Sequence, residues 1–194
     1  MRIVSGEWRG RKIAEPQGRE VTRPTTDRVR EAMGSMVESA LDEGIDGARV
    51  LDAYAGSGAL GIEMLSRGAA HATFCDIDRG AAALVKKNLE SVRCGRGRYQ
   101  VLTGDVLAFA KRGRVPGGPF DLVMVDAPYA LGAKPALDLV DGLIAAGLLA
   151  PRAVLLVEHD AQDAGPRPEG FTVVREKKYG KTAVDLLRYE PDAS

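Results

Sequence analysis

The chain has 194 residues, of which 28% are charged, and its 27 basic and 27 acidic side chains give a formal net charge of zero. This length suits one three-layer α/β core and is too short for two complete domains of that kind. No apolar run is long enough to span a bilayer, the first residues resemble no signal peptide, and the two cysteines and two histidines have neither disulfide nor metal-ligand spacing. We therefore expect a metal-free cytoplasmic protein, and a monomer because no exposed heptad is evident.

Positive charge is concentrated at the amino end. Residues 1–30 carry eight basic and four acidic side chains, and the rest of the chain balances this excess. The asymmetry predicts a basic N-terminal arm, residues 1–21, that contacts phosphate groups, and one catalytic domain over residues 22–194; a solvated basic face is the alternative. Trp8 either packs the arm or stacks on a base, and we favour packing. The candidate phosphate ligands are Arg9, Arg11, Lys12, Arg23, Arg28, Lys178 and Lys181.

Apolar spacing predicts the secondary structure in chain order. Residues 1–13 are expected to form a small hairpin, and a helix follows from about Thr26, with Thr25 or Thr26 as its cap. Strands and helices then alternate, which predicts a parallel sheet with helical crossovers. The expected strands are 49–53, 71–76, 98–103, 120–126 and 152–158, and the expected helices are 58–68, 79–93, 105–112 and 135–147.

The chain ends in two further strands, 171–178 and 182–189, which are expected to form an antiparallel hairpin. A mixed seven-stranded sheet with such a hairpin is similar to the Rossmann-like fold of class I S-adenosylmethionine-dependent methyltransferases. A nicotinamide-binding fold more often continues with parallel strands. The predicted fold class is therefore α/β of the class I methyltransferase type.

A glycine-rich turn follows the strand at 49–53. Gly56 and Gly58 permit positive φ and close approach of the backbone to a ligand, and the helix that starts near Gly58 directs free N–H groups toward it. Asp52 would repel a pyrophosphate but attract the amine of an amino acid, so the turn favours S-adenosylmethionine over NAD. A purely structural turn is the alternative. The candidate cofactor ligands here are Asp52, Ala53, Ala55, Gly56, Ser57 and Gly58.

Acidic residues end the next two strands. Asp76, with Ile77 beside it, stands about 20 residues beyond the glycines, where Rossmann-type sites hold the ribose hydroxyls. Asp78 is expected to cap the following helix. Asp105, with Val106, is placed to accept a hydrogen bond from an adenine amino group, and a second helix cap is the alternative.

The strand at 120–126 ends in Asp126, Ala127, Pro128 and Tyr129. A carboxylate, backbone carbonyls and an aromatic ring at the carboxyl end of a buried strand can grip a planar base that carries an exocyclic amine. A chance turn after a strand is the alternative for this motif taken alone.

These segments resemble the RsmD family of 16S rRNA guanine-N2 methyltransferases over nearly the whole chain. The resemblance is carried by residues 5–12, 23–31, 55–61 and 126–129. The family usually has proline where this chain has Ala127, which keeps the backbone carbonyl but loosens the local φ restraint.

The resemblance implies direct transfer of a methyl group from S-adenosylmethionine to N2 of a guanine, guanine 966, of 16S rRNA in the small ribosomal subunit or its assembly intermediate. Asp126 and the carbonyl of Ala127 or Pro128 would hold the amine, Tyr129 would stack on the flipped-out base, and Thr25 or Thr26 would border the methionine carboxylate. Alternatives are an adenine-N6 or cytosine-N4 methyltransferase, a protein-glutamine methyltransferase, and a non-catalytic rRNA-binding assembly factor. A Rossmann dehydrogenase is the least favoured.

Overall fold

Strands and helices alternate along the chain in the computed structural model, which describes residues 1–16 and 26–191. The strands are β1 (Arg49–Asp52), β2 (His71–Asp76), β3 (Tyr99–Thr103), β4 (Phe120–Val125), β5 (Leu149–Asp160), β6 (Phe171–Tyr179) and β7 (Thr182–Tyr189). The helices are α1 (Asp27–Ala40), α2 (Ala59–Ser66), α3 (Arg79–Ser91), α4 (Val106–Lys111) and α5 (Lys134–Ala145), with short 3₁₀ helices η1 (Arg96–Arg98) and η2 (Tyr129–Leu131).

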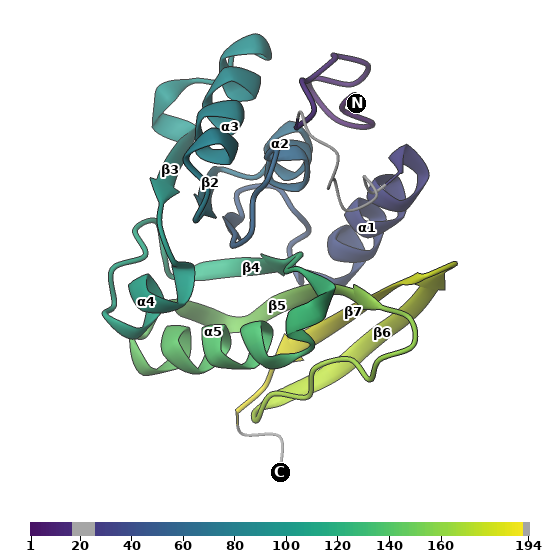
Figure 1. Ribbon diagram of the computed structural model, residues 1–194, viewed down its shortest axis with the longest axis vertical. Coiled ribbons are helices and arrows are strands. Elements are labelled where there is room, and N and C mark those ends of the chain that lie inside the picture. Colours follow the sequence, from purple (N-terminus) through teal and green to yellow (C-terminus); the bar gives the residue numbers. More distant parts are fainter. Residues whose placement is uncertain (17–25, 192–194) are drawn as a thin grey trace.

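Within the described residues, seven strands form one sheet in the order β3-β2-β1-β4-β5-β7-β6 (Figure 1). β1 is parallel to β2 and β4, and β5 is parallel to β4, whereas β7 is antiparallel to both β5 and β6. The expected class I methyltransferase fold with its antiparallel terminal hairpin is confirmed. Because the chain moves outward from β1 to β3 and returns to β4 on the other side of β1, a crevice opens at the carboxyl ends of β1 and β4.

Helices cover both faces of the sheet (Figure 1). α1, α2 and α3 contribute to one apolar cluster, and α4 and α5 contribute to the other. Val50 belongs to the first cluster and its neighbour Leu51 to the second, because successive side chains of a strand point to opposite faces. The central strands are thus buried on both sides, as expected of a parallel sheet, whereas the edge strand β6 is largely exposed.

Helix caps follow the sequence closely. The Thr26 hydroxyl accepts a hydrogen bond from the Val29 N–H at 3.4 Å, and the Asp78 carboxylate accepts one from the Ala81 N–H at 2.7 Å. Both residues were expected caps.

β5 begins three residues before its predicted start, because Arg152 adopts a φ of 61° and the pairing with β4 shifts register there.

The N-terminal segment (residues 1–14) packs on the body of the protein. Arg2 lies opposite Lys12 in an antiparallel bridge, so the chain folds back on itself as expected, but with one bridge in place of a ladder. Ile3, Trp8 and Ile13 are buried in the cluster under α1 and α2. Trp8 therefore packs, and its ring also lies 5.4 Å from the Arg98 guanidinium.

Buried polar side chains hold this segment to two helices. On α2, the Ser66 hydroxyl accepts from the Trp8 N–H at 2.9 Å and donates to the Ser5 carbonyl at 2.6 Å. On α3, the Asn88 amide exchanges two hydrogen bonds with the Ala14 backbone, at 2.8 and 3.0 Å. These bonds satisfy backbone groups that no sheet pairs.

No helix in residues 1–16 or 26–191 combines the length and the apolar character needed to cross a membrane.

Gly6 provides a test of this docking. It has a φ of +76°, and an added Cβ would lie 1.8 Å from the Ser66 carbonyl oxygen. We expect Gly6→Ala to release the N-terminal segment, so that the emission of Trp8, the single tryptophan, shifts to longer wavelength. Gly10 is the matched control, because its φ is +82° but nothing lies within 4 Å of an added Cβ.

Gly10→Ala should cost only about 1 kcal/mol of unfolding free energy, from the left-handed backbone alone, and should leave the emission of Trp8 unchanged. Equal spectra for the two variants would contradict the docking.

Candidate functional site

A cleft of about 560 Å³ opens at the carboxyl ends of β1, β4 and β5. This volume is within the range that holds a small organic ligand. The cleft is lined by the turn after β1, the motif after β4, the end of β5, the β6–β7 turn and residues near α1. Its lining residues are Met1, Pro16, Thr26, Val29, Arg30, Asp52, Tyr54, Ala55, Gly56, Ser57, Ala59, Leu60, Asp126, Ala127, Pro128, Tyr129, Glu158, Asp160, Tyr179, Gly180, Lys181 and Thr182.

The glycine turn (residues 53–58) forms one wall. Gly56 and Gly58 have φ values of 53° and 78°, which confirms the positive φ expected of both. Ala55, Gly56 and Ser57 line the cleft, and Gly58 caps α2 in the left-handed conformation. Ala53 is buried, and its N–H donates a hydrogen bond to the Met124 carbonyl at 3.0 Å. Ala53 itself therefore does not line the cleft, although the residues that follow it do.

Asp52 lies at the base of the cleft. Its side chain is buried, and one oxygen accepts a hydrogen bond from the Gly61 N–H at 3.0 Å. Burial, together with the nearby charge of Asp76, raises the pKa of Asp52 to about 7, although the Gly61 bond opposes the shift. A positively charged ligand at this carboxyl would favour its ionised form.

The acids at the ends of β2 and β3 lie beside the glycine turn. Asp76 accepts from the Gly56 N–H at 2.8 Å and from the Asp78 N–H at 2.9 Å, so it fixes the shape of the turn. Ile77 is 75% exposed and offers an apolar surface next to it.

Asp105 accepts from the Leu107 N–H at 2.9 Å and caps α4, which was the alternative for this residue. Val106 packs in the core under α4 and α5. The sequence placed both residues at the cofactor, and that role stays a prediction.

The motif at 126–129 forms the opposite wall. Asp126 follows β4, Ala127 is buried, and Pro128 is exposed at the rim. Burial, then the charge of Glu158 and then that of Asp52, raise the pKa of Asp126 well above its usual range. The side chain of Asp126 reaches the cleft, but protein surrounds most of it.

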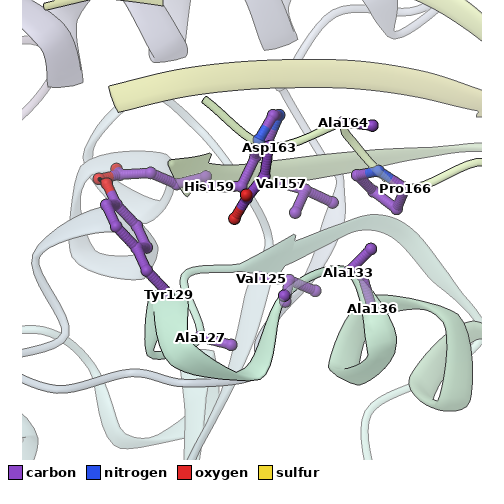
Figure 2. A pocket seen from close by; sticks show the side chains of 12 residues that line it. Val125, Ala127, Tyr129, Ala133, Ala136, Val157, His159, Asp163, Ala164 and Pro166 are labelled. Carbon is purple, nitrogen blue, oxygen red and sulfur yellow. Dashed lines mark hydrogen bonds between the residues drawn. The ribbon is translucent and has the colours of Figure 1, made fainter. Parts of the chain in front are cut away.

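Tyr129 is held by its hydroxyl. The phenol oxygen donates to Glu158 Oε1 at 3.0 Å and lies 3.0 Å from the Thr182 hydroxyl. Figure 2 shows Tyr129 reaching from the loop after β4 toward β5, with Ala127 behind it on the same loop. Burial raises the pKa of the phenol, which therefore remains a hydrogen-bond donor at neutral pH.

The sequence analysis missed several polar lining groups, among them Glu158, Thr182 and Arg30. Glu158 carried a signal that could have been used, because it is an acid near the carboxyl end of an apolar strand. Arg30 carried no such signal, because a charged residue in an amphipathic helix is expected at the surface. In the structure Arg30 is buried, and one guanidinium nitrogen donates to the Arg2 carbonyl at 2.7 Å and to the Asp27 carboxylate. Burial lowers the pKa of Arg30.

The predicted phosphate ligands occupy three surfaces. Arg9, Arg11 and Lys12 are exposed on the N-terminal segment, although Arg11 also donates to the Val92 carbonyl at 2.9 Å. Arg28 is exposed on α1, Lys178 donates to the Ala161 carbonyl at 2.9 Å, and Lys181 is exposed and lines the cleft. Arg23 and Thr25 lie outside the described residues.

Comparison with known proteins agrees with this geometry. A family model described as conserved hypothetical protein 95 matches residues 1–188. The chain is 36% identical over 192 residues to Ribosomal RNA small subunit methyltransferase D of Escherichia coli K12, which covers 98% of this chain and 90% of that protein. The Haemophilus influenzae protein of the same name is 34% identical over 189 residues, with 97% and 93% covered. A solved structure from E. coli with a provisional methyltransferase name superposes with a TM-score of 0.82 at 33% identity, over 99% of each chain.

Asp52 makes stability depend on pH. Its pKa is about 7 in the folded protein and near 3.8 in an unfolded chain, so between these pH values the folded state holds a proton that the unfolded state has released. This contribution lowers the unfolding free energy as the pH rises, by roughly 1.4 kcal/mol per pH unit at most. Asp52→Asn lacks it.

We therefore expect the stability of the ligand-free Asp52→Asn variant, relative to wild type, to rise between about pH 4 and pH 7 and to level off above. Urea unfolding across this range measures the difference. Asp141→Asn, on the exposed side of α5, is the control and should track wild type at each pH. A difference for Asp52→Asn that does not change with pH would contradict the shifted pKa.

Proposed function

Since this chain belongs to the family described as conserved hypothetical protein 95, the RsmD family, we propose that it methylates the exocyclic N2 of a guanine in 16S rRNA with S-adenosylmethionine. The observation that carries the proposal is that residues 126–129 and the glycine turn line one cleft. The motif that we assign to the target base and the turn that we assign to the cofactor therefore line the same cleft. A cofactor and a base bound there together would be neighbours.

The residues of the cleft fit this cofactor. Asp52 is a buried carboxyl whose pKa rises to about 7, so it suits the amine of the methionine moiety. Arg30 and the amino end of α1 supply the positive potential that suits the carboxylate. When bound, the cofactor supplies an electrophilic methyl group on a positively charged sulfonium. Ile77, which follows Asp76, and Asp105, whose charge acts on Tyr54 of the glycine turn, are assigned to the adenosine.

Asp126 is the group that we assign to the guanine amine. The N2 lone pair is delocalised into the ring, so an acceptor that holds an amine hydrogen must also aim the lone pair at the methyl carbon. The Asp126 carboxylate and the carbonyl of Ala127 or Pro128 do this, and Tyr129 stacks on the base. As the N–C bond forms and the C–S bonding pair stays on sulfur, one N2 proton passes to Asp126.

The basic residues are assigned to rRNA. Arg9, Arg11 and Lys12 are exposed on a segment that is bonded to α2 and α3, so phosphate contacts there are made from a fixed position. Lys181 lines the cleft and is assigned to the phosphate beside the target nucleotide. By family resemblance the target is guanine 966 of 16S rRNA, in the small subunit or its assembly intermediate. A base in a loop costs less free energy to flip out than a base in a helix, which favours a loop nucleotide as the target.

Methyl transfer tests the proposed reaction. With labelled S-adenosylmethionine and undermethylated small-subunit particles, we expect the label in N2-methylguanosine on nucleoside analysis. Asp126→Asn keeps one acceptor oxygen and Asp126→Ala keeps none, so positioning predicts losses of about 10²-fold and about 10³-fold in rate. Asp141→Asn is the control. Label in another nucleoside would reject guanine N2 as the acceptor, and no label at all would favour an assembly factor.

Cofactor binding should release protons. A cation near Asp52 and Asp126 favours their ionised forms, so affinity should rise with pH through the range around pH 7 in which Asp52 titrates. S-adenosylmethionine carries one more positive charge than S-adenosylhomocysteine and should release more protons. Calorimetry at pH 7 in buffers of different ionisation enthalpy measures both numbers. Equal release for the two ligands would contradict a sulfonium beside Asp126.

A further inference from the structure

An acid follows β4, and β5 carries an acid at the same position along the sheet. The two strands are parallel, with Val125 paired to Val157, so Asp126 and Glu158 follow as neighbours on adjacent strands. Both line the cleft, and Glu158 is only 6% exposed. We refer to these two residues as the acidic pair.

The two charges of the acidic pair repel each other. Like charges on adjacent strands destabilise a sheet, and withdrawal from water increases the cost. The effect is visible in the raised pKa of Asp126, to which the charge of Glu158 contributes. Glutamine would fill the position of Glu158 with nearly the same shape and without this repulsion, so a second carboxylate at the reacting end of the cleft requires a chemical reason.

Glu158 is also held in a fixed orientation. Tyr129 donates its phenol hydrogen to Glu158 Oε1 at 3.0 Å, and Thr182 of β7 contacts the same phenol oxygen at 3.0 Å. The carboxylate is thus oriented by the aromatic ring that we assign to base stacking. A base lying on Tyr129 would meet the acidic pair edge-on.

The edge of guanine matches two adjacent acceptors. Guanine presents the N1–H and the N2 amine side by side, whereas adenine N1 and cytosine N3 are acceptors that a carboxylate would repel. We propose that Glu158 accepts the N1–H of the target guanine while Asp126 accepts the N2 amine, so that Glu158 determines which base is methylated. This inference rests on the proposed function and assigns its base specificity to a residue outside the 126–129 motif.

2-Aminopurine separates the two contacts, because it keeps the amine at C2 but has an unprotonated N1. The substrates are two synthetic rRNA fragments, with guanine or 2-aminopurine at the nucleotide that the particle experiment identifies. Wild type should prefer guanine in kcat/KM by about 10²-fold. Glu158→Gln can turn its amide N–H toward the unprotonated N1, so this preference should fall by at least about tenfold.

Two variants complete the test. Tyr129→Phe removes the hydroxyl that donates to Glu158, so the ring is held less firmly, and it should lower transfer to both fragments without changing their ratio as much as Glu158→Gln does. Asp141→Asn should match wild type on both. Binding of S-adenosylhomocysteine and the emission of Trp8 report whether each variant is folded.

If the ratio of kcat/KM for the two fragments is unchanged in a folded Glu158→Gln variant, Glu158 does not select the base, and the proposed reaction is unaffected. If Tyr129→Phe changes this ratio as much as Glu158→Gln does, the proposed contact of Glu158 with the base is also overturned. Glu158 would then act only by holding the Tyr129 ring in place. Failure of wild type to methylate the guanine fragment and the particles would overturn the proposed function and the proposed role of Glu158 together.

Discussion

The parallel pairing of β1 with β4 is the constraint on which the site depends. In this register Asp52 is the partner of Met124, so Asp126 stands two residues further along the adjacent strand. The chain leaves β1 through the glycine turn toward α2 on one face and leaves β4 toward α5 on the other, and the space between these exits is the cleft. A slip of one residue would exchange the faces of every side chain of β4 and separate the acids from the glycine turn.

Carboxyl groups are concentrated in the cleft. Asp52, Asp126 and Glu158 converge on one volume, while the buried cation Arg30 is bonded to Asp27 and to a backbone carbonyl. A folded domain does not need such a concentration of like charge, and perturbed carboxyls that share a cleft are typical of a functional site. Under the proposed function, a cationic cofactor would relieve this repulsion, and a guanine edge would offer hydrogens to the same oxygens. One set of acids would then serve both the ligand that gives the methyl group and the base that receives it.

Local signals predicted most of the fold, and non-local contacts account for what was missed. The order of strands, the caps Thr26 and Asp78 and the terminal hairpin follow from periodicity and turn chemistry, which act over a few residues. The acids after β1 and β4 were found because strand ends are recognisable in a sequence. Glu158 carries the same strand-end signal, but its hydrogen bond with Tyr129, 29 residues away, is set by the β4–β5 register and could not be predicted locally. The burial of Arg30 depends on how α1 packs, which no pattern within α1 specifies.

Asn88 joins two parts of the protein that we assign to different ligands. Its side chain bonds the Ala14 backbone at the end of the N-terminal segment, and it also donates to the Ser57 carbonyl of the glycine turn at 2.8 Å. One amide therefore belongs both to the support of the basic surface and to the wall of the cofactor cleft. In terms of thermodynamic linkage, a free-energy change transmitted through this amide acts equally in both directions. A cofactor that tightens the turn against Asn88 would strengthen RNA binding on the segment by the same factor by which RNA strengthens cofactor binding.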